Sequence, residues 1–476
     1  MGFSGAQEKA CSPLIHLIAG QGRMEEDITA KSKSPVTALV QARLEEAIDA
    51  AQKKQDYKSA HDPELLEAIH VVEAFLRKKQ RVCYGGTAMN MILPPSKQFY
   101  DLNYEIPDYD FFTPQLEEDT VELVKMLKEA GFSDIYHRVG IHKGTKKILV
   151  NFIPIADITY ISPAEYSVFL KRSIVREGLH YTDPDLLRMM MYLELSRPSG
   201  QVGRWLKVYE RLELLNTEFP VKIPKGLCKT SFSKEKMTRR KGRKSVTDVR
   251  SLLYNFVIES QRILVNGPLI DVYERGILQG NSTLKLLPGG CVTFVSPTPR
   301  RDVKMLLESI PKSRQLKVLK HAAVGEIVPE RLEIVEHGTP ICLIIQDMAC
   351  HSYYPITFED GRTILIGSLE FLITLYSSLG FFTKRSQRFF DGISPLCHLK
   401  KLIHFARLNA RTKSSQFPAF TTLCKGHQKG FVSLLREKVQ RLKEEKDALA
   451  AYPEEKYSSR SLTRKKSKKG TKRDAT

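Results

Sequence analysis

The sequence contains no run of 18 apolar residues, about the length that a helix needs to cross a membrane. Its N-terminus also lacks the basic stretch and long apolar core of a secretory signal. Met1-Gly2 matches the start of a myristoylation signal, but Ala6 occupies the position where that signal requires Ser or Thr. With 476 residues, 42% of them hydrophobic, we expect a soluble globular protein of two or three domains.

Cysteine motifs are missing as well. The eight cysteines form no CxxC pair and do not cluster with histidines, so the spacing typical of structural zinc sites is absent. Scattered single cysteines are typical of proteins from reducing compartments. We therefore expect free thiols, a cytosol-like compartment and no zinc.

Acidic residues are too few to balance the basic ones, and the formal net charge is +20. Residues 222–250 hold eleven Lys and Arg against two acids, and residues 456–476 hold nine against one. Such focused charge favours contact with nucleic-acid phosphates without sequence selectivity. The RNA-binding candidates in the first segment are Arg239, Arg240, Lys241, Arg243 and Lys244. A solubilising or targeting role is the alternative for both segments.

One stretch, residues 81–114, holds the pattern around which the chain is organised. An apolar segment, Val82–Tyr84, is followed by Gly85-Gly86 and then by a helix-compatible segment, which predicts a strand, a tight turn and a helix. Glycines at the start of a helix leave backbone N–H groups accessible to phosphates. Gly85, Gly86 and Thr87 are therefore candidates for nucleotide binding, although most glycine pairs are plain turns.

The same stretch ends with two acids that alternate with aromatic residues, Asp108 and Asp110. On a strand their side chains would share a face, with Cα atoms roughly 6.5 to 7 Å apart. Like charges at that distance are costly unless one is protonated or a cation lies between them. Asp157, alone in an apolar β-branched run, is expected on a buried strand. Three such carboxylates can hold two Mg²⁺ ions for phosphoryl transfer, whereas an Asp-aromatic-Asp pattern alone more often marks a solvated edge strand.

In this order, the glycine pair, the Asp-x-Asp pattern and the later Asp resemble the motif of the polymerase-beta-like nucleotidyltransferases. The flanking sequences YGGTAMN, PDYDFFTP, ADITY and RWLKVYERL resemble, more narrowly, the poly(A) polymerase catalytic subunits of large nucleocytoplasmic DNA viruses. The resemblance covers about residues 62–220. The 21 residues between Gly86 and Asp108 exceed the usual spacing of the superfamily, but the viral group tolerates this insertion. The resemblance implies an α+β fold with a nucleotidyltransferase core, a mixed sheet with helices.

The resemblance also implies template-independent addition of AMP from ATP to RNA 3′ ends. Asp108, Asp110 and Asp157 would then be the catalytic residues and the ligands of two ions, Mg²⁺ or Mn²⁺. Asp157 would also help to accept the proton of the 3′-hydroxyl. The residues themselves indicate nucleotidyl transfer but not the base, so a uridylyl or CCA-adding transferase stays open. A noncatalytic RNA-binding subunit is a third possibility.

Partners and location follow from the same resemblance. The partners would be the RNA 3′ end and ATP, with either a homodimer or a separate processivity factor, and no membrane. The expected location is the host cytoplasm, in the viral factory, and the virion is a second one.

Three basic residues, Arg204, Lys207 and Arg211, stand at i, i+3 and i+7, so a helix would present them on one face. In the viral family the matching face lies near the nucleotide, which makes Arg204 and Lys207 candidates for triphosphate contact. A solvated basic face explains the spacing equally well.

The second half of the chain repeats the pattern in a weaker form. An apolar stretch with Cys291 and Thr293 parallels the stretch that holds the first two acids, and a later one with Asp347 parallels that of the third. The interval from Thr293 to Asp347 is 54 residues, against 47 between the corresponding acids. One remaining carboxylate cannot hold two divalent ions. We hypothesise a second, degenerate nucleotidyltransferase-like α/β lobe that grips RNA or forms a dimer; a chance match of short apolar strings is the alternative.

Helical patterns and composition predict the domain boundaries. Ser34-Pro35 and Asp62-Pro63 start amphipathic helices, and residues 428–450 form a charged final helix. The predicted domains are an N-terminal arm and helix (1–60), a catalytic nucleotidyltransferase domain (61–220), a basic linker (221–250), a second nucleotidyltransferase-like or RNA-binding domain (251–450) and a basic disordered tail (451–476).

Overall fold

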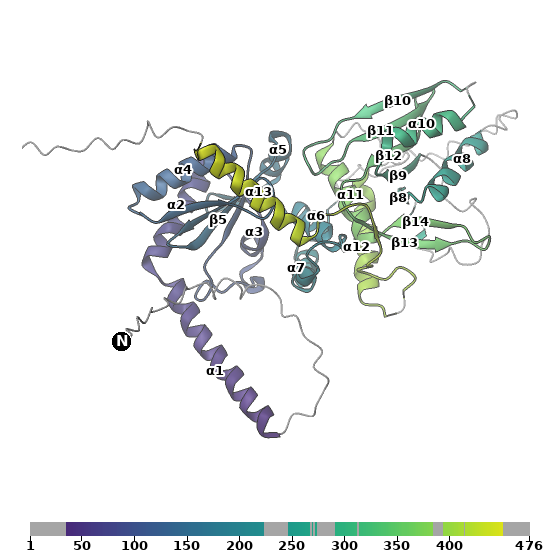
Figure 1. The fold of residues 1–476 in the computed structure, drawn as a ribbon. Helices are drawn as coiled ribbons and strands as arrows, with labels where there is room; N and C mark the ends of the chain where they lie inside the picture. The colour runs from purple at the N-terminus through teal and green to yellow at the C-terminus, as the bar shows by residue number, and fades with distance from the viewer. Residues whose placement is uncertain are drawn as a thin grey trace, which may run out of the picture.

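The computed structural model describes residues 35–222, 246–266, 269, 272–273, 291–311, 314–383, 394–413 and 415–450. The fold is α+β, as predicted, and consists of two lobes that each contain one mixed sheet (Figure 1). We call residues 35–222 the first lobe and residues 246–425 the second lobe. The last helix, α13 (Phe431–Ala450), returns to the first lobe and lies against it.

The first lobe begins with two helices and continues into a seven-stranded sheet. Its elements are α1 (Pro35–Ala60), α2 (Pro63–Lys79), β1 (Val82–Cys83), α3 (Gly85–Ile92), η1 (Pro95–Lys97), β2 (Tyr109–Thr113), α4 (Leu116–Glu129), β3 (Ile135–Val139), β4 (Thr145–Val150), β5 (Ile153–Tyr160), α5 (Pro163–Arg172), β6 (Ile174–Arg176), β7 (Leu179–Tyr181), α6 (Pro184–Leu195), η2 (Val202–Arg204) and α7 (Trp205–Glu218). The strand order is β3-β4-β5-β2-β1-β7-β6. Strand β2 is parallel to β5, and β1 is antiparallel to β2 and parallel to β7.

The two ends of α2 fix where the chain enters the sheet. Asp62 caps the helix by accepting two backbone N–H groups at 3.0 Å, as its Asp-Pro sequence predicts. Gln80, with a φ of 52°, ends it. The next residue, Arg81, is buried, and its guanidinium donates to both carboxylate oxygens of Asp119 in α4, at 2.6 and 3.0 Å. This ion pair holds the start of β1 against α4.

Helix α1 has the predicted start and the predicted apolar face, but that face is not covered by the described residues. Leu39, Val40, Leu44 and Ile48 are between 50 and 61% exposed. Figure 1 shows α1 extending away from the rest of the first lobe. Side chains that stay this exposed contribute little to the burial energy of the lobe.

The second lobe contains an eight-stranded sheet. Its elements are α8 (Val246–Glu259), β8 (Ile263–Leu264), β9 (Val292–Ser296), α10 (Pro299–Ser309), β10 (Leu316–His321), β11 (Arg331–Glu336), β12 (Thr339–Gln346), β13 (His351–Thr357), β14 (Thr363–Gly367), α11 (Leu369–Phe382), α12 (Leu396–Ala410) and β15 (Cys424–Lys425). The strand order is β10-β11-β12-β9-β8-β14-β13-β15. Strand β9 is parallel to β12, and β8 is antiparallel to β9 and parallel to β14.

The two sheets have the same topology. When β8 is placed on β1, β9 on β2 and β12 on β5, the seven strands of the first sheet all find a counterpart with the same neighbours and directions, and β15 is an addition at the edge. The buried ion pair recurs too: Arg262 donates through two nitrogens to Asp302 of α10, each at 2.8 Å. A chance match of apolar strings would not reproduce strand order, direction and this pair. The predicted repeat is therefore confirmed.

The register of the second sheet corrects one part of the predicted repeat. Asp110 lies opposite Asp157, and its counterpart Thr293 lies opposite Leu343. The residue that matches Asp157 is therefore Leu343, and the predicted match to Asp347, which follows the end of β12, is wrong. The error is a shift of four residues, which keeps each side chain on its face of the strand and leaves the apolar pattern unchanged. None of the three acidic positions remains acidic in the second lobe.

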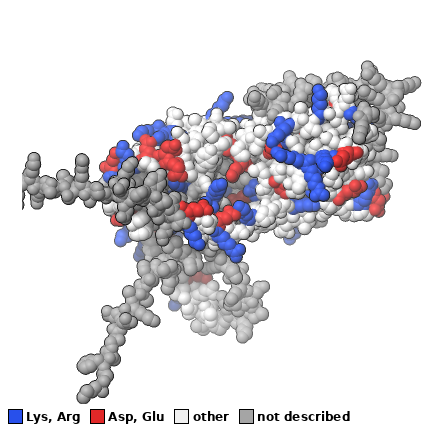
Figure 2. Space-filling view, turned by 45° about the horizontal axis from the view of Figure 1, so that its top comes forward, with Lys and Arg blue, Asp and Glu red and all other residues white. Residues whose placement is uncertain are grey.

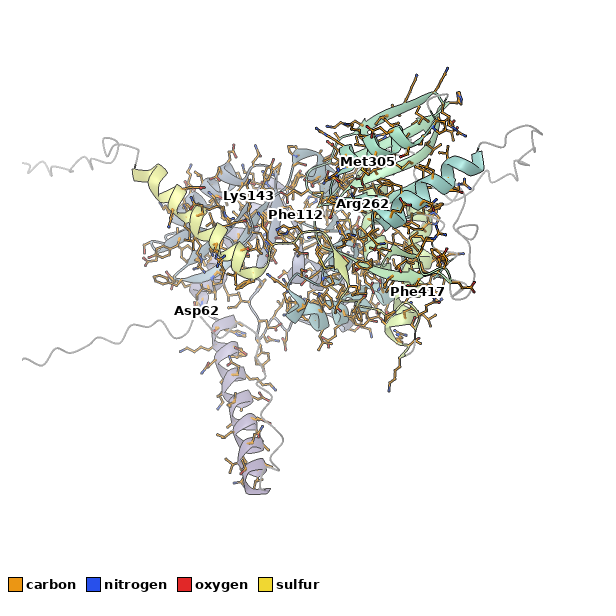
Figure 3. The ribbon with its side chains drawn as sticks, turned by 45° about the vertical axis from the view of Figure 1, so that its right-hand side comes forward. Asp62, Phe112, Lys143, Arg262, Met305 and Phe417 are labelled. Carbon is orange, nitrogen blue, oxygen red and sulfur yellow. A yellow bond between two sulfur atoms is a disulfide. The ribbon has the colours of Figure 1, made fainter. Side chains whose placement is uncertain are left out.

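The lobes meet through a continuous apolar core. Phe112 of β2, labelled in Figure 3, packs on Phe169 of α5 with ring centroids 4.8 Å apart, and Phe169 contacts Phe382 of α11 at 5.6 Å. The buried carboxylate of Glu165 in α5 accepts two backbone N–H groups of the second lobe, at 2.8 and 3.1 Å. The second lobe thus packs directly on the helix that follows β5.

Three cysteines contradict the expectation of free thiols, because Cys350, Cys397 and Cys424 are disulfide-bonded. Cys350 and Cys424 form a disulfide, with Cα atoms 5.5 Å apart. They are separated by 74 residues in sequence and come together because β13 pairs with β15. Sequence spacing therefore gave no sign of the pair. Cys83 and Cys342 are free and buried, and Cys291 is buried as well.

Two broader expectations concern the membrane and the charge. Within the described ranges, no helix combines the length and the apolarity that a membrane crossing requires. On the face shown in Figure 2, Lys and Arg side chains are interspersed with Asp and Glu. The two basic segments of the sequence lie almost entirely outside the described residues.

Candidate active site

The acids meet at the centre of the first sheet. Asp110 is the second residue of β2, between the buried Tyr109 and Phe111, and lies directly opposite Asp157 of the parallel strand β5. Residues directly opposite each other project from the same face of a sheet, so the two carboxylates share a face. Asp108 stands one residue before the strand, not within it as predicted, and its side chain is exposed to solvent.

The pKa values of Asp108 and Asp110 are raised by their surroundings. Desolvation by the surrounding protein, followed by the charges of Asp108 and Asp157, raises the pKa of Asp110 to about 7. Desolvation and then the charge of Asp157 also raise the pKa of Asp108, even though the Asp108 side chain reaches solvent. A group of acids whose protonated forms are favoured in this way is suited to bind a cation.

Lys147 is a site residue that the sequence interpretation missed. It lies on β4 directly opposite Asp157, and its ammonium donates to Asp157 Oδ2. Its charge also lowers the pKa of both Asp108 and Asp110. The sequence alone does not single out Lys147, because only the pairing of β4 with β5 brings it next to Asp157.

The donor set fits a divalent cation by its chemistry. Carboxylate oxygens are preferred ligands of Mg²⁺, and Asp157 Oδ1 is buried without a hydrogen-bond partner among the described residues. As placed, the described residues contain no group of three or more His, Cys, Asp or Glu side chains at metal-binding spacing. Asp108, Asp110 and Asp157 would hold Mg²⁺ or Mn²⁺, and this assignment stays a prediction.

The glycine turn lies against the acids, and each glycine is required for a different reason. Gly85 has a φ of 74°, and a Cβ atom there would lie 2.5 Å from Asp110 Oδ2. A Cβ on Gly86 would overlap the Tyr100 hydroxyl and lie 2.9 Å from an Arg211 guanidinium nitrogen. The turn starts α3 as predicted, and its backbone lies next to both Asp110 and the Arg211 guanidinium.

Thr87, the third candidate of the turn, holds the first acid in place. Its hydroxyl donates to the backbone carbonyl of Asp108 at 2.8 Å, and the side chain is buried. The backbone N–H of Tyr84 likewise donates to the carbonyl of Asp110, at 2.8 Å. The turn therefore positions the backbone of both acids, whether or not Thr87 contacts a nucleotide.

Helix α7 brings the predicted basic face to the same turn. Arg204 is the residue that precedes α7, and its guanidinium lies 3.5 Å from Glu194 Oε1. Lys207 is exposed, and its pKa is lowered chiefly by the charge of Arg211. Arg211, which is not among the predicted nucleotide contacts, donates to the Tyr100 hydroxyl at 2.8 Å and lies above the Phe99 ring at 4.5 Å. Of the three, Arg211 is the one next to the glycine turn.

The predicted RNA contacts are not part of this geometry. Arg239, Arg240, Lys241, Arg243 and Lys244 lie outside the described residues. The roles assigned to Arg204, Lys207 and the glycine turn stay predictions, because the fold brings them close to the acids without testing what they bind.

Comparison with known sequences supports the resemblance. Residues 70–201 match the family model described as Poly(A) polymerase catalytic subunit. Two curated viral relatives are both named "Putative poly(A) polymerase catalytic subunit". The one from Acanthamoeba polyphaga mimivirus is 32% identical over 188 residues, which are 38% of this chain and 32% of the relative. The one from African swine fever virus (strain Badajoz 1971 Vero-adapted) is 27% identical over 179 residues, 36% of each chain. The matched part of the chain thus spans about a third of the length of these relatives.

A solved structure extends the likeness to the whole fold. The crystal structure of the Megavirus polyadenylate synthase superposes with a TM-score of 0.68 and 18% identity, covering 90% of this chain and 86% of that one. At this identity the match shows the fold and not the chemistry. The family resemblance predicted from the motifs is confirmed, and it covers residues 70–201, which carry the glycine turn and the acids Asp108, Asp110 and Asp157.

Proposed function

We propose that the protein is a template-independent poly(A) polymerase that transfers AMP from ATP to the 3′-hydroxyl of RNA. The observation that carries the proposal is the pairing of Asp110 with Asp157 on adjacent parallel strands, with Asp108 and the Gly85 turn beside them. The family match of residues 70–201 supports the choice of reaction. Nucleotidyl transfer needs carboxylates and an open phosphate-binding turn together, and a solvated edge strand needs neither.

In the proposed reaction the RNA 3′-oxygen forms a bond to the α-phosphorus of ATP, the α–β phosphoanhydride breaks and pyrophosphate leaves. Two divalent ions, Mg²⁺ or Mn²⁺, would stabilise charge on the attacking and leaving oxygens. Asp108 and Asp110 would hold both ions, and Asp157 would complete the second site. Asp157 Oδ1, which has no partner among the described residues, is the atom suited to accept the hydroxyl proton.

The cations around the glycine turn would bind the triphosphate. Gly85 and Gly86 keep side chains out of the space next to Asp110, so a phosphate can approach the backbone. Arg211 extends over this space, and Arg204 and Lys207 lie on the same side of α7. Guanidinium groups form charge-assisted hydrogen bonds with phosphate oxygens, which would orient the leaving pyrophosphate.

The choice of ATP rests on the family match. A uridylyl or CCA-adding transferase would use the same acids, and a noncatalytic RNA-binding subunit would keep them as structural residues. A homodimer or a separate processivity factor, and action in the host cytoplasm with a place in the virion, belong to the same proposal, because the relatives are proteins of large DNA viruses.

Primer extension on an unstructured RNA, with each NTP and each metal supplied separately, tests the proposal. We expect long products with ATP and either Mg²⁺ or Mn²⁺, and none with Asp108→Ala, which should bind RNA with unchanged affinity. Preferred incorporation of UTP or CTP would assign another transferase. RNA binding without incorporation of any nucleotide would leave only the noncatalytic subunit.

A further inference from the structure

Helix α13 is oriented in the opposite way to an ordinary surface helix, which turns its apolar side toward the protein. Val432, Leu435, Val439 and Leu442 are 59, 40, 52 and 41% exposed. The half-buried side, which faces the first lobe, is mainly charged and consists of Leu434, Glu437, Lys438 and Arg441. Burying charged side chains costs free energy, so the inward charged face is better explained by ligand binding than by packing.

The inward face is held at the β3 end of the catalytic sheet. Arg441 donates to the backbone carbonyls of Gly140 and Ile141, at 3.1 and 2.9 Å, in the loop between β3 and β4. Lys438, three residues earlier, lies on the same face of the helix, and α13 packs against β3, the strand that carries Arg138. Desolvation, and then the like charges of Arg138, Lys147 and Arg441, lower the pKa of Lys438. We call Arg138, Lys438 and Arg441 the basic wall.

The sheet register connects the basic wall to the acids. Arg138 lies opposite Lys147, Lys147 opposite Asp157, and Asp157 opposite Asp110, so a single row of side chains runs across β3, β4, β5 and β2. Side chains in such a row project from one face. With strands about 4.8 Å apart, Arg138 is two strands, or about 10 Å, from Asp157. The wall therefore lies two strands beyond Asp157, with Lys147 between them.

The wall gathers positive charge that the protein does not neutralise. Within the described part of the chain, neither Arg138 nor Lys438 has a carboxylate at ion-pair distance, and the nearby Glu437 is bonded to Lys429 at 2.6 Å. Clustered cations of this kind repel one another unless a polyanion lies between them. The positive charges of the basic wall therefore suit a ligand with repeated phosphates.

We propose that the basic wall binds the backbone phosphates of the RNA next to its 3′ end, and that α13 forms one side of the path by which the RNA reaches Asp157. This inference rests on the proposed function. The topology separates the two substrates: β1 and the glycine turn lie on one side of β2, with Arg211 above them, whereas the wall lies on the other side, beyond Asp157. The nucleotide would enter from the first side and the RNA from the second.

The test compares two double variants. Arg138→Gln with Lys438→Gln removes two charges of the wall and leaves Arg441, which attaches the helix, intact. The control, Arg436→Gln with Lys443→Gln, removes two charges from exposed positions of the same helix. The measurements are the equilibrium binding of a short fluorescent oligoadenylate over a series of KCl concentrations, and the KM values for that RNA and for ATP.

For the wall variant we expect RNA affinity to fall about tenfold or more and the slope of log affinity against log salt to decrease by about 1.4, because each lost phosphate contact removes about 0.7. The KM for ATP should change less than twofold, and the control should resemble the wild type. Equal salt slopes in the two variants would refute the wall. A raised KM for ATP with unchanged RNA binding would assign these cations to the triphosphate instead. If the wild-type protein neither binds nor extends RNA, the proposed function itself fails, and the wall loses its ligand with it.

Discussion

The two lobes share one sheet topology, but the side chains in the central row of the sheet differ: those of the first lobe are charged, and those of the second lobe are mostly uncharged. The row Arg138, Lys147, Asp157 and Asp110 crosses the first sheet, and the same positions of the second sheet are Leu319, Glu333, Leu343 and Thr293. Both lobes keep the buried Arg–Asp pair that ties the first strand to the helix after the second. The shared framework therefore does not depend on the chemistry of the row.

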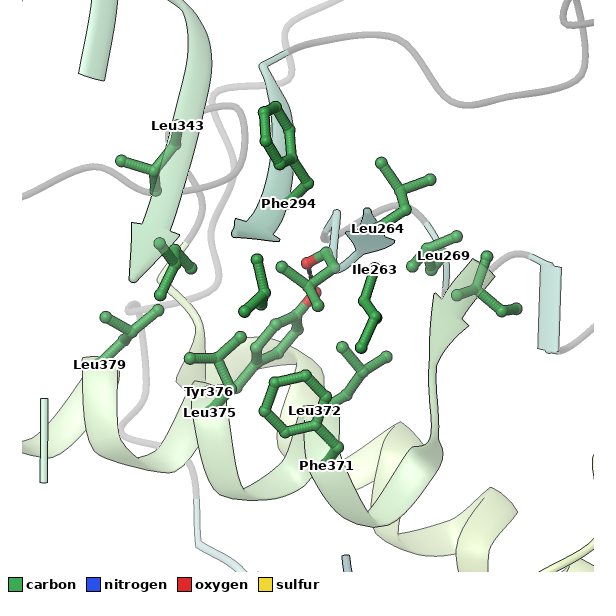
Figure 4. Close-up of a cluster of buried hydrophobic side chains, with 14 of the residues drawn as sticks. Ile263, Leu264, Leu269, Phe294, Leu343, Phe371, Leu372, Leu375, Tyr376 and Leu379 are labelled. Carbon is green, nitrogen blue, oxygen red and sulfur yellow. Dashed lines mark hydrogen bonds between the residues drawn. The ribbon is translucent and has the colours of Figure 1, made fainter. Parts of the chain in front are cut away.

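The second lobe fills the space that the first leaves open. Leu343 points into an apolar cluster with Leu379, and Phe294 lies beside it (Figure 4). Asn266, the counterpart of Gly85, is buried, accepts the backbone N–H of Thr293 at 2.6 Å and donates to the Tyr254 hydroxyl at 3.0 Å. Where Gly85 leaves room beside an acid, Asn266 closes that room with its own side chain. A buried leucine contributes about 1.5–3 kcal/mol, whereas three neighbouring carboxylates cost stability.

The largest difference between the lobes should appear in activity. Asp110→Asn is expected to reduce primer extension on the order of a thousandfold or more, because it removes a ligand charge worth several kcal/mol to the transition state. Thr293→Val, at the matching position of the second lobe and nearly isosteric, should stay within twofold of the wild type. Single-turnover extension rates check both. Comparable losses in the two variants would mean that the second lobe takes part in the chemistry.

The shared ion pair should matter for folding in both lobes. Arg81→Gln leaves Asp119 buried without its main partner and should lower the free energy of unfolding by about 3–5 kcal/mol. Arg262→Gln should cost less, since the Arg262 side chain is 16% exposed, against 7% for Arg81. Urea unfolding measures both. An insensitive Arg81→Gln variant would show that the pair is not part of the common framework.

At the position of Asp157 and its counterpart Leu343, we expect the residue of the second lobe to matter more for stability. Leu343→Ala should destabilise the protein by about 2–5 kcal/mol through the cavity it leaves. Asp157→Ala should change the free energy of unfolding by less than about 1 kcal/mol, because it releases a lysine whose side chain is one-third exposed. Urea midpoints of the two variants give the answer. If Asp157→Ala proved the more damaging, the acid would be structural.

Much of this arrangement could be predicted from the sequence, because its signals are local. The Asp-Pro start of α2, the glycine turn and the alternation around Asp110 each report a backbone preference or a face. The repeat could also be found, since the apolar strings recur at similar intervals.

What could not be predicted depends on register and on distant partners. Lys147 is a site residue only because β4 pairs with β5 in one particular register. The sequence match also placed Asp347 at a position that the strand register assigns to Leu343, four residues earlier. The Cys350 disulfide and the approach of α13 to β3 join segments far apart in sequence, for which periodicity carries no information. Both are consequences of tertiary packing.

The smallest expected effect concerns the pH dependence of stability. The pKa of Asp110 is raised from its ordinary 3.8 to about 7, so between these values the folded protein holds a proton that the unfolded chain has lost. Rising pH then favours unfolding, and ionised Asp110 destabilises the folded state fully above about pH 7. In EDTA, Asp110→Asn should therefore match the wild type in thermal midpoint near pH 4 and exceed it increasingly up to pH 7.

Two controls test whether the pH effect comes from the charge of Asp110. Thr293→Val, at the uncharged counterpart, should differ from the wild type by the same amount at every pH. Adding Mg²⁺ at pH 8 should raise the midpoint of the wild type but not of Asp110→Asn, because a cation that binds only the folded acids stabilises them by mass action. A midpoint difference between Asp110→Asn and the wild type that does not vary with pH would mean that neither burial nor the charges of Asp108 and Asp157 raise the pKa of Asp110. The first lobe would then lack the unfavourable electrostatics at its acids that distinguish it from the second lobe.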